Sequence, residues 1–305
     1  ERGFCLVGSE MCIRDRSLVM TTQANLSPAF VQLFDAEVHQ AYQSSAVLNG
    51  AARTRTGVVG STVNFPKVGK GQASVRTPAT DVVPLNTAFS SVSCSLTDYV
   101  AAEYSDIFLQ TKINFDERRE LAQVVGNAIG RRQDQVLLDA LGTASAGSTV
   151  ANTVVTTGSA TATNLNVGKI IEAKKLLDKK NVPAQNRHMI IHANNLSGLL
   201  SDERAISSDF QTIQALVQGS INQMMGFTFH ILGDRDEGGL SIDGSNDRTC
   251  FAFHQSAVGV AVGIAPSTEI NYIAEKTSFL VTGKLSMGSV VIDTDGLVDV
   301  TCREA

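Results

Sequence analysis

The stretch GVVGSTVNFPKVGKGQASVRTPATDVVPLNTAFS (residues 57–90) decides the fold of this chain. It holds three of the chain's six prolines, four glycines and few large apolar side chains. Such a composition indicates an extended two-stranded hairpin outside the core, because proline breaks helices and is confined to the edges of sheets. Short alternating apolar pieces support strands over disorder: Val63 and Phe65; Val82, Val83 and Leu85; Val92, Cys94 and Leu96.

A hairpin of about 34 residues without a core of its own needs another surface to cover it. Residues 49–90 carry five basic side chains and one acidic one, a net charge of +4, whereas the whole chain carries −5. We therefore expect a basic arm that docks on an acidic neighbouring copy, with charge setting the orientation. The expected contact residues are Arg53, Arg55, Val63, Phe65, Lys67, Lys70, Arg76, Val82 and Leu85. A solvated basic loop is the open alternative.

The composition excludes several classes of protein. With 43% hydrophobic residues, the 305-residue chain can bury a substantial core in one large or two linked domains. A pI near 5.6 argues against a chain whose main task is to grip nucleic acid, and the absence of Trp leaves little for base stacking. The five cysteines form no CxxC pair, so we expect reduced thiols and no zinc site. Apolar runs such as residues 258–265 are too short to span a membrane.

Helix signals mark the first half of the chain. Residues 1–19 do not follow the plan of a secretory signal; they resemble a translated adapter remnant, with a native disordered leader as the alternative. Ser27 and Pro28 start a predicted amphipathic helix that reaches Tyr42. Asn114 and Glu117 resemble a capping box for a long helix over residues 115–141, which Gly142 should end. Within this helix, Gly126 and Gly130 indicate close approach of another backbone.

The second half mixes helices and strands outside a βαβ rhythm, which favours an α+β fold. We expect a loop or weak hairpin over residues 143–163. Helices are predicted over residues 167–180 with Asn166 as cap, 195–201 and 210–218. Strands are predicted over residues 189–191, 227–232, 250–253, 258–262, 269–274, 279–285 and 289–300.

No motif for catalysis or cofactor binding is present. The sequence has no GxSxG elbow, no phosphate loop and no dinucleotide fingerprint, so we expect no cofactor and no enzymatic activity. His188 and His192 are four residues apart, but the apolar residues between them indicate a strand, so a metal there is disfavoured. One loop is rich in acidic residues: Asp234, Asp236, Glu237, Asp243 and Asp247. We interpret it as a solvated loop and not as a calcium site, because the spacing of these residues matches no EF-hand.

The order of these parts resembles that of tailed-bacteriophage major capsid proteins of the Hong Kong ninety-seven type. The similar runs are YVAAEYSDIFLQTKINFDERRELAQVVGNAIGRRQD (residues 99–134), IIHANNLSGLLSDERAISSDF (190–210), GSINQMMGF (219–227), FHQSAVGV (253–260) and GSVVIDTDGLVDV (288–300). The resemblance covers nearly everything from Met20 onward, and it lies in the order of the parts more than in any single motif.

This resemblance implies a division of the chain. Residues 20–56 would be the N-terminal arm, 57–96 the E-loop hairpin and 97–162 the P-domain with its spine helix. Residues 163–265 would form the axial A-domain, and 266–305 the return strands. Some family members join an E-loop lysine to a neighbour's asparagine; Lys67 and Lys70 lie in the right region, but no partner residue can be chosen.

The implied function is self-assembly through hexamers and pentamers into an icosahedral virion shell around double-stranded DNA, built in the bacterial host cytoplasm. Implied partners are further copies of the chain, a separate scaffolding protein, a portal protein and weakly held DNA, with no membrane. An encapsulin nanocompartment of the same fold is the alternative function, and a hydrolase built on the second domain is a remoter one.

Overall fold

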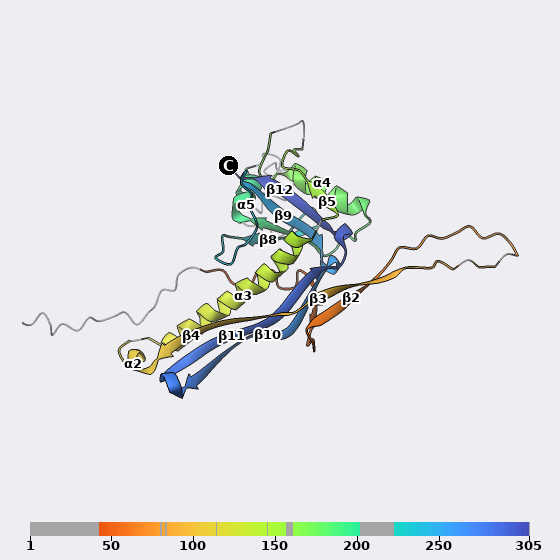
Figure 1. Cartoon of the computed structure of the whole chain (residues 1–305). Coiled ribbons are helices and arrows are strands. Elements are labelled where there is room, and N and C mark those ends of the chain that lie inside the picture. The colour runs from red at the N-terminus through yellow and green to blue at the C-terminus, as the bar shows by residue number, and fades with distance from the viewer. Residues whose placement is uncertain are drawn as a thin grey trace, which may run out of the picture.

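The computed structural model describes residues 43–304, except 80, 83, 114, 145, 157–160 and 202–222. Its longest element is helix α3 (Glu117–Thr143), which runs diagonally along one half of the molecule (Figure 1). The helix buries Val125, Ile129, Leu137, Leu138 and Leu141. The predicted long helix is therefore confirmed. The predicted stop at Gly142 was wrong, because the helix continues through Gly142 to Thr143. At the other end, Asp116 and not Asn114 is the N-cap residue; Asn114 lies outside the described residues.

A four-stranded sheet lies against α3, in the order β1 (Arg53–Thr56), β10 (Val258–Ile273), β11 (Ser278–Val291) and β4 (Thr97–Asp106). Strand β1 runs parallel to β10, and the other pairs are antiparallel. Gly283 of β11 lies directly beneath the helix, where an added Cβ would come within 2.7 Å of Val125 and 2.8 Å of Ile129. A glycine at this position lets helix and sheet pack closely. Short helix α2 (Ile107–Gln110) follows β4.

A six-stranded sheet forms the other half of the molecule, in the order β5-β12-β9-β6-β8-β7. Its strands are β5 (Ser148–Val150), β12 (Leu297–Arg303), β9 (Asp247–His254), β6 (Arg187–His192), β8 (Phe227–Leu232) and β7 (Gln223–Met224). Helices α4 (Val167–Lys179) and α5 (Ala193–Leu200) pack on it. The Asn166 side chain accepts a hydrogen bond from the Lys169 N–H at 3.0 Å, which confirms the predicted cap.

Residues 43–52 form an entry segment that crosses α3 before β1. Asp134 of α3 accepts hydrogen bonds from the backbone N–H groups of Val47 (2.9 Å) and Leu48 (3.0 Å). The same carboxylate pairs with Arg235 at 2.8 Å, and both side chains are 1% exposed. Ala46 lies so close to Gly130 that an added Cβ would be 3.1 Å from its nitrogen. Close approach is thus confirmed at Gly130, whereas Gly126 has only a contact at 3.8 Å.

Two strand predictions need correction. The predicted strands 258–262 and 269–274 belong to the single strand β10, whose register with β11 shifts between Val262 and Ser267. The predicted strand 289–300 is the end of β11, a 3-10 turn (Thr294–Gly296) and β12, because the chain crosses there from one sheet to the other. The predicted helices 27–42 and 210–218 lie outside the described residues.

Candidate subunit-contact surface

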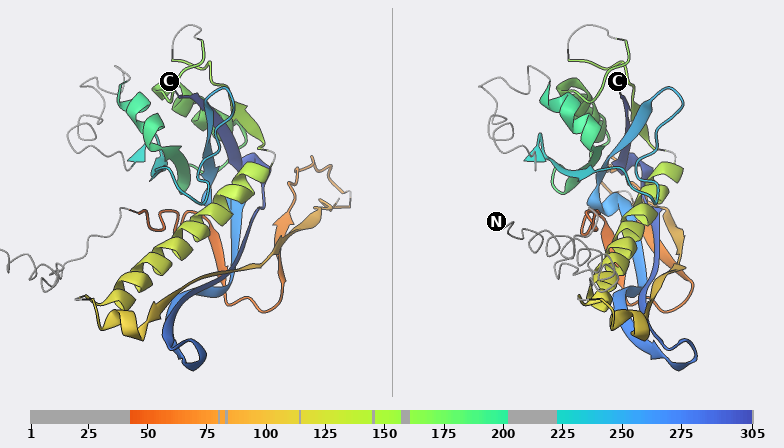
Figure 2. Two further views of the ribbon diagram at one scale, coloured as in Figure 1. Left: turned by 60° about the vertical axis from the view of Figure 1, so that its left-hand side comes forward. Right: turned by 90° about the vertical axis from the view of Figure 1, so that its left-hand side faces the viewer.

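The hairpin consists of β2 (Thr62–Val68), β3 (Phe89–Ser95) and the connecting residues 69–88. The two strands pair antiparallel from Thr62 opposite Ser95 to Val68 opposite Phe89. The connecting residues extend beyond them, and the tip projects away from both sheets (Figures 1 and 2). The sequence therefore located the hairpin correctly, but Val82 and Leu85, which alternation assigned to a strand, lie in the connection outside both strands.

The base of the hairpin packs on its own subunit. Val63 (7% exposed) and Phe65 (2%) form a small core with Cys94, Ala261 and Ile292. An added Cβ at Gly259 of β10 would come within 3.0 Å of the Phe65 ring. Val63 and Phe65 were predicted to contact a neighbouring copy, but the side chains are already covered within the chain. Alternation showed that one face of the hairpin is buried, and it could not show which surface buries it.

The two hairpin lysines are also engaged within the subunit. Lys67 pairs with Asp293 at 2.9 Å, and Lys70 pairs with Asp295 at 3.2 Å. Lys180, at the end of α4, reaches the same Asp295 at 3.1 Å. Hydrogen bonds from Lys180 and Lys70 hold the pKa of the Asp295 carboxyl below its usual value. This base cluster ties the hairpin to the turn between β11 and β12.

The remaining predicted contact residues are open to solvent. Arg53 and Arg55 are exposed on β1, and Arg76 is exposed near the hairpin tip. Val82 is 79% exposed and Leu85 is 58% exposed. Residue-by-residue prediction missed further exposed apolar side chains of the same segment, namely Val59, Val68, Val75 and Phe89. The signal for Val75 was present, because it stands alone among small and polar neighbours.

Most of the side chains considered for metal binding have protein partners. His188 and His230 lie on neighbouring strands with ring nitrogens 3.0 Å apart. Burial, together with repulsion from His230 and His254, lowers the pKa of His188 to about 4. In the acidic loop, Glu237 pairs with Arg131 at 2.8 Å and Asp247 with Arg303 at 2.6 Å.

Within the described part of the chain, no group of three or more His, Cys, Asp or Glu side chains is placed to hold a metal ion. The cysteines of the same part, Cys94, Cys250 and Cys302, are buried free thiols. None of the described helices combines the length and the apolar character of a membrane span.

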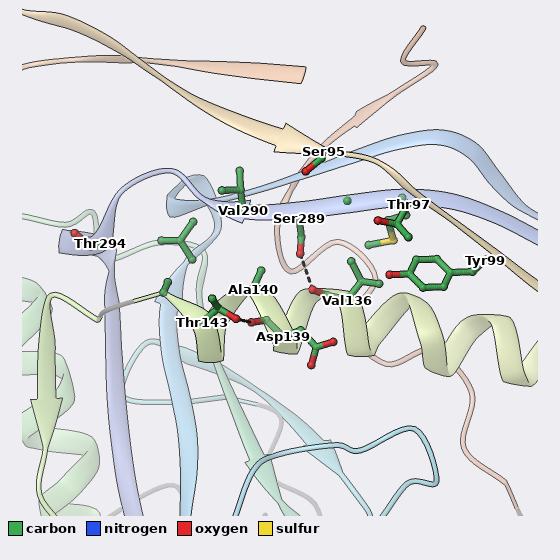
Figure 3. A pocket seen from close by; sticks show the side chains of 14 residues that line it. Ser95, Thr97, Tyr99, Val136, Asp139, Ala140, Thr143, Ser289, Val290 and Thr294 are labelled. Carbon is green, nitrogen blue, oxygen red and sulfur yellow. Dashed lines mark hydrogen bonds between the residues drawn. The ribbon is translucent and has the colours of Figure 1, made fainter. Parts of the chain in front are cut away.

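A hollow of about 540 Å³ lies between the C-terminal half of α3, β11 and the start of β4 (Figure 3). Tyr99 and Val136 line it, and the Ser289 hydroxyl donates to the Val136 carbonyl at 2.6 Å across its floor. A second hollow of about 320 Å³ lies between β4 and the N-terminal half of α3. The structure thus offers an exposed basic hairpin and a hollowed surface along its long helix.

Known proteins of similar sequence or structure identify the family to which this architecture belongs. Residues 26–304 match the family described as Phage capsid protein. The head structure of Helicobacter pylori bacteriophage KHP40 is similar over 100% of both chains, with a TM-score of 0.72 and 11% identity. The capsid of cyanophage P-SCSP1u has a TM-score of 0.69 and 16% identity, over 92% of this chain and 95% of that one.

A structure described as Mycobacterium phage Che8 has a TM-score of 0.65 and 17% identity, over 89% of this chain and 96% of the other. No curated protein matches this chain in sequence. The structural matches confirm the α+β fold of phage capsid proteins. The family match covers more than half of the sequence. The chain therefore belongs to the phage capsid protein family, whose members are structural proteins of the virion.

Proposed function

We propose that copies of this chain assemble through hexamers and pentamers into an icosahedral shell around double-stranded DNA, with each hairpin lying over an adjacent subunit. One observation carries the proposal: the hairpin tip exposes Val75 (98%), Val82 (79%) and Leu85 (58%), and its own subunit leaves them uncovered. Exposed apolar side chains grouped on a projecting segment are typical of a protein interface. A repeated interface also needs little strength per copy, because many contacts act together.

The parts of the fold take the corresponding roles in this proposal. The hairpin is the E-loop, and α3 with the four-stranded sheet is the P-domain. The six-stranded sheet with α4 and α5 is the A-domain, around which the rings close. The base cluster supports this division, because it fixes the hairpin at the boundary between the two sheets.

Three partners besides further copies of the chain belong to the proposal: a scaffolding protein, a portal protein and the packaged DNA. Membership of the family is the argument for all three. The formal charge of −5 supports weak, non-specific contact with DNA, because tight binding needs a basic face. The family match favours a phage head over an encapsulin compartment.

The test compares the whole chain with a variant that lacks the hairpin tip. Deleting residues 72–86 leaves the paired strands intact, and the added Cβ of Gly71 would lie 3.8 Å from the Thr87 hydroxyl, so the ends join readily. We expect closed particles of the whole chain in electron micrographs, and folded but unassembled subunits of the variant. A variant with Ser at positions 75, 82 and 85 keeps the chain length and should assemble equally poorly. Normal shells from both variants would refute the proposed role of the hairpin.

A further inference from the structure

The single asparagine–glycine pair of the sequence, Asn49–Gly50, lies at a turn of the entry segment. Both residues are exposed, and the Ala51 N–H closes the turn by donating to the Leu48 carbonyl at 3.1 Å. The flanking residues are anchored in the core, because Leu48 is 4% exposed and Ala51 is 0% exposed. An exposed peptide bond thus lies between two fixed points.

This peptide bond has the chemistry of a self-modifying pair. The backbone nitrogen that follows an asparagine can attack the side-chain amide carbon and close a five-membered ring. Glycine favours the attack, because it has no Cβ to obstruct the approach. Gly50 has a φ of +81°, and an added Cβ would meet nothing within 4 Å. Its N–H group makes no hydrogen bond to any described residue, so the attacking nitrogen is available.

A side chain of α3 is placed to assist this attack. Nε2 of Gln133 donates a hydrogen bond to Oδ1 of Asn49 at 2.7 Å. Negative charge develops on this oxygen when the nitrogen adds to the amide carbon, and a donor that is already in place stabilises the charge. Gln133 is only partly exposed on α3, so the helix holds the donor in position. On the other side of the turn, Gln255 donates to the Gly50 carbonyl at 2.9 Å.

Two aspartate–glycine pairs of the chain, which can form the same ring, are placed less favourably. In the first, the Asp243 carboxylate accepts hydrogen bonds from two N–H groups of its own loop, at 2.9 and 2.8 Å. In the second, the Gly296 N–H already donates to a backbone carbonyl at 3.1 Å. Hydrogen bonds from Lys180 and Lys70 also hold the pKa of the Asp295 carboxyl below its usual value, and an ionised carboxylate resists attack by nitrogen.

We propose that Asn49 is a self-modification site, at which the chain converts its own side-chain amide into a carboxylate with assistance from Gln133. The Gly50 nitrogen gives up its proton and bonds to Cγ of Asn49. The bond from Cγ to Nδ2 breaks, and Nδ2 leaves with that proton as ammonia. Water then opens the succinimide ring at one of its two carbonyls, which yields aspartate or isoaspartate. Water is the only co-reactant.

The isoaspartate product changes the length of the main chain. It adds one carbon atom to the backbone between the anchored residues Leu48 and Ala51, so the turn and both buried side chains no longer fit together. It also places a negative charge beside Leu48, whose N–H is bound by the Asp134 carboxylate. The modification should therefore loosen the entry segment from α3 as the protein ages. This inference is independent of shell assembly.

Peptide mapping of the purified full chain at mildly alkaline pH tests the reaction, because the attacking nitrogen loses its proton more readily there. Trypsin places Asn49 in the peptide of residues 17–53, and fragmentation in the mass spectrometer locates the modified residue. Asn86 and Asn271 are internal controls, since both are exposed and a larger residue follows each. Asn49 should convert about tenfold faster than either control, because glycine leaves the approach open. Isoaspartyl methyltransferase should label the product peptide. Equal rates, or a product without isoaspartate, would overturn the proposal.

The variant Gln133→Met tests the assisting donor. Methionine is similar to glutamine in length and helix propensity but donates no hydrogen bond. In the folded chain the variant should slow the conversion of Asn49 about threefold, because the developing charge loses its donor. It should leave the two control residues unaffected and should change nothing in urea-unfolded chains, where the hydrogen bond is absent. An unchanged or faster conversion in the folded variant, or an equal slowing in urea, would overturn the role of Gln133.

The variant Asn49→Ser tests the structural consequence. During prolonged incubation, the urea midpoint of the parent chain should fall as its isoaspartyl fraction rises, whereas the midpoint of the variant should stay constant. An equal fall in both chains would overturn the proposed loosening of the entry segment.

Discussion

Asp134 is the side chain whose loss should cost this subunit the most stability. Its carboxylate is buried between α3, the entry segment and the loop before β9. It accepts hydrogen bonds from the N–H groups of Val47 and Leu48 and from Nη1 of Arg235. The Nε and Nη2 atoms of Arg235 have no hydrogen-bond partner among the described residues, so Asp134 is the one counter-charge bonded to this buried guanidinium there. Asp134→Ala leaves a buried cation and two buried donors unpaired.

The expected magnitude follows from these contacts. Removing one partner of a buried ion pair costs about 3–5 kcal/mol, so Asp134→Ala should lower the free energy of unfolding by about 4 kcal/mol. Asp134→Asn keeps an amide oxygen for the backbone N–H groups and should lose about half of that. The double variant Asp134→Ala with Arg235→Ala should lose less free energy of unfolding than the two single variants lose together, because neither charge of the pair then remains buried without its partner.

Urea unfolding of unassembled subunits, followed by circular dichroism, measures these differences. At a slope near 2–3 kcal/mol per M, the midpoint for Asp134→Ala should fall by about 1.5 M. Glu172→Ala is the control, since it removes an exposed pair with Lys175 on α4 and should cost less than about 0.5 kcal/mol. The reasoning is refuted if Asp134→Ala is no more damaging than this control.

Three further predictions use the same assay. Gly126→Ala should raise the free energy of unfolding by about 0.5–1 kcal/mol, whereas Gly130→Ala should lower it, because its Cβ would press on Ala46; equal effects would contradict the packing. The pKa of His188 lies at about 4 in the fold against 6.5 in the unfolded chain. As the pH falls, the unfolded chain therefore binds the proton first, and the free energy of unfolding should drop by at most about 3 kcal/mol between pH 6.5 and 4. In the variant His188→Gln this drop should be smaller. Burial raises the pKa of Asp299 from 3.8 to about 6, so its charge destabilises the fold as the pH rises through this window; Asp299→Asn should add at most about 3 kcal/mol at pH 7 and little at pH 4.

Local signals predicted elements well where neighbouring residues decide them. The cap at Asn166 and the strand over residues 227–232 were correct, because a polar cap and a β-branched, aromatic run act within a few residues. Strand β4 was not predicted. Its sequence, TDYVAAEYSD, shows no clean alternation, since most of its side chains are exposed on both faces. Its strand conformation comes from pairing with β11, far along the chain.

The contact surface shows the same division. Sequence reasoning located the hairpin and its exposed Arg76, Val82 and Leu85, because composition alone marks a segment without a core. It could not foresee that Phe65 packs against Gly259, since the two residues are nearly two hundred positions apart. The two hollows along α3 could not be predicted either, because their walls come from β4 and α3 and exist only after the fold brings these elements together.

The way the hairpin is held has a mechanical consequence. The buried Phe65 side chain fixes the base of the hairpin, so it can act as the pivot of a tilting motion. The ion pairs of Lys67 and Lys70 are partly exposed, and breaking them costs little free energy. About ten extended residues beyond the pivot make a lever of roughly 30 Å, so a tilt of about 10° displaces its end by about 5 Å. Identical chains can thus reach differently angled neighbours by rocking one appendage, with neither sheet repacked.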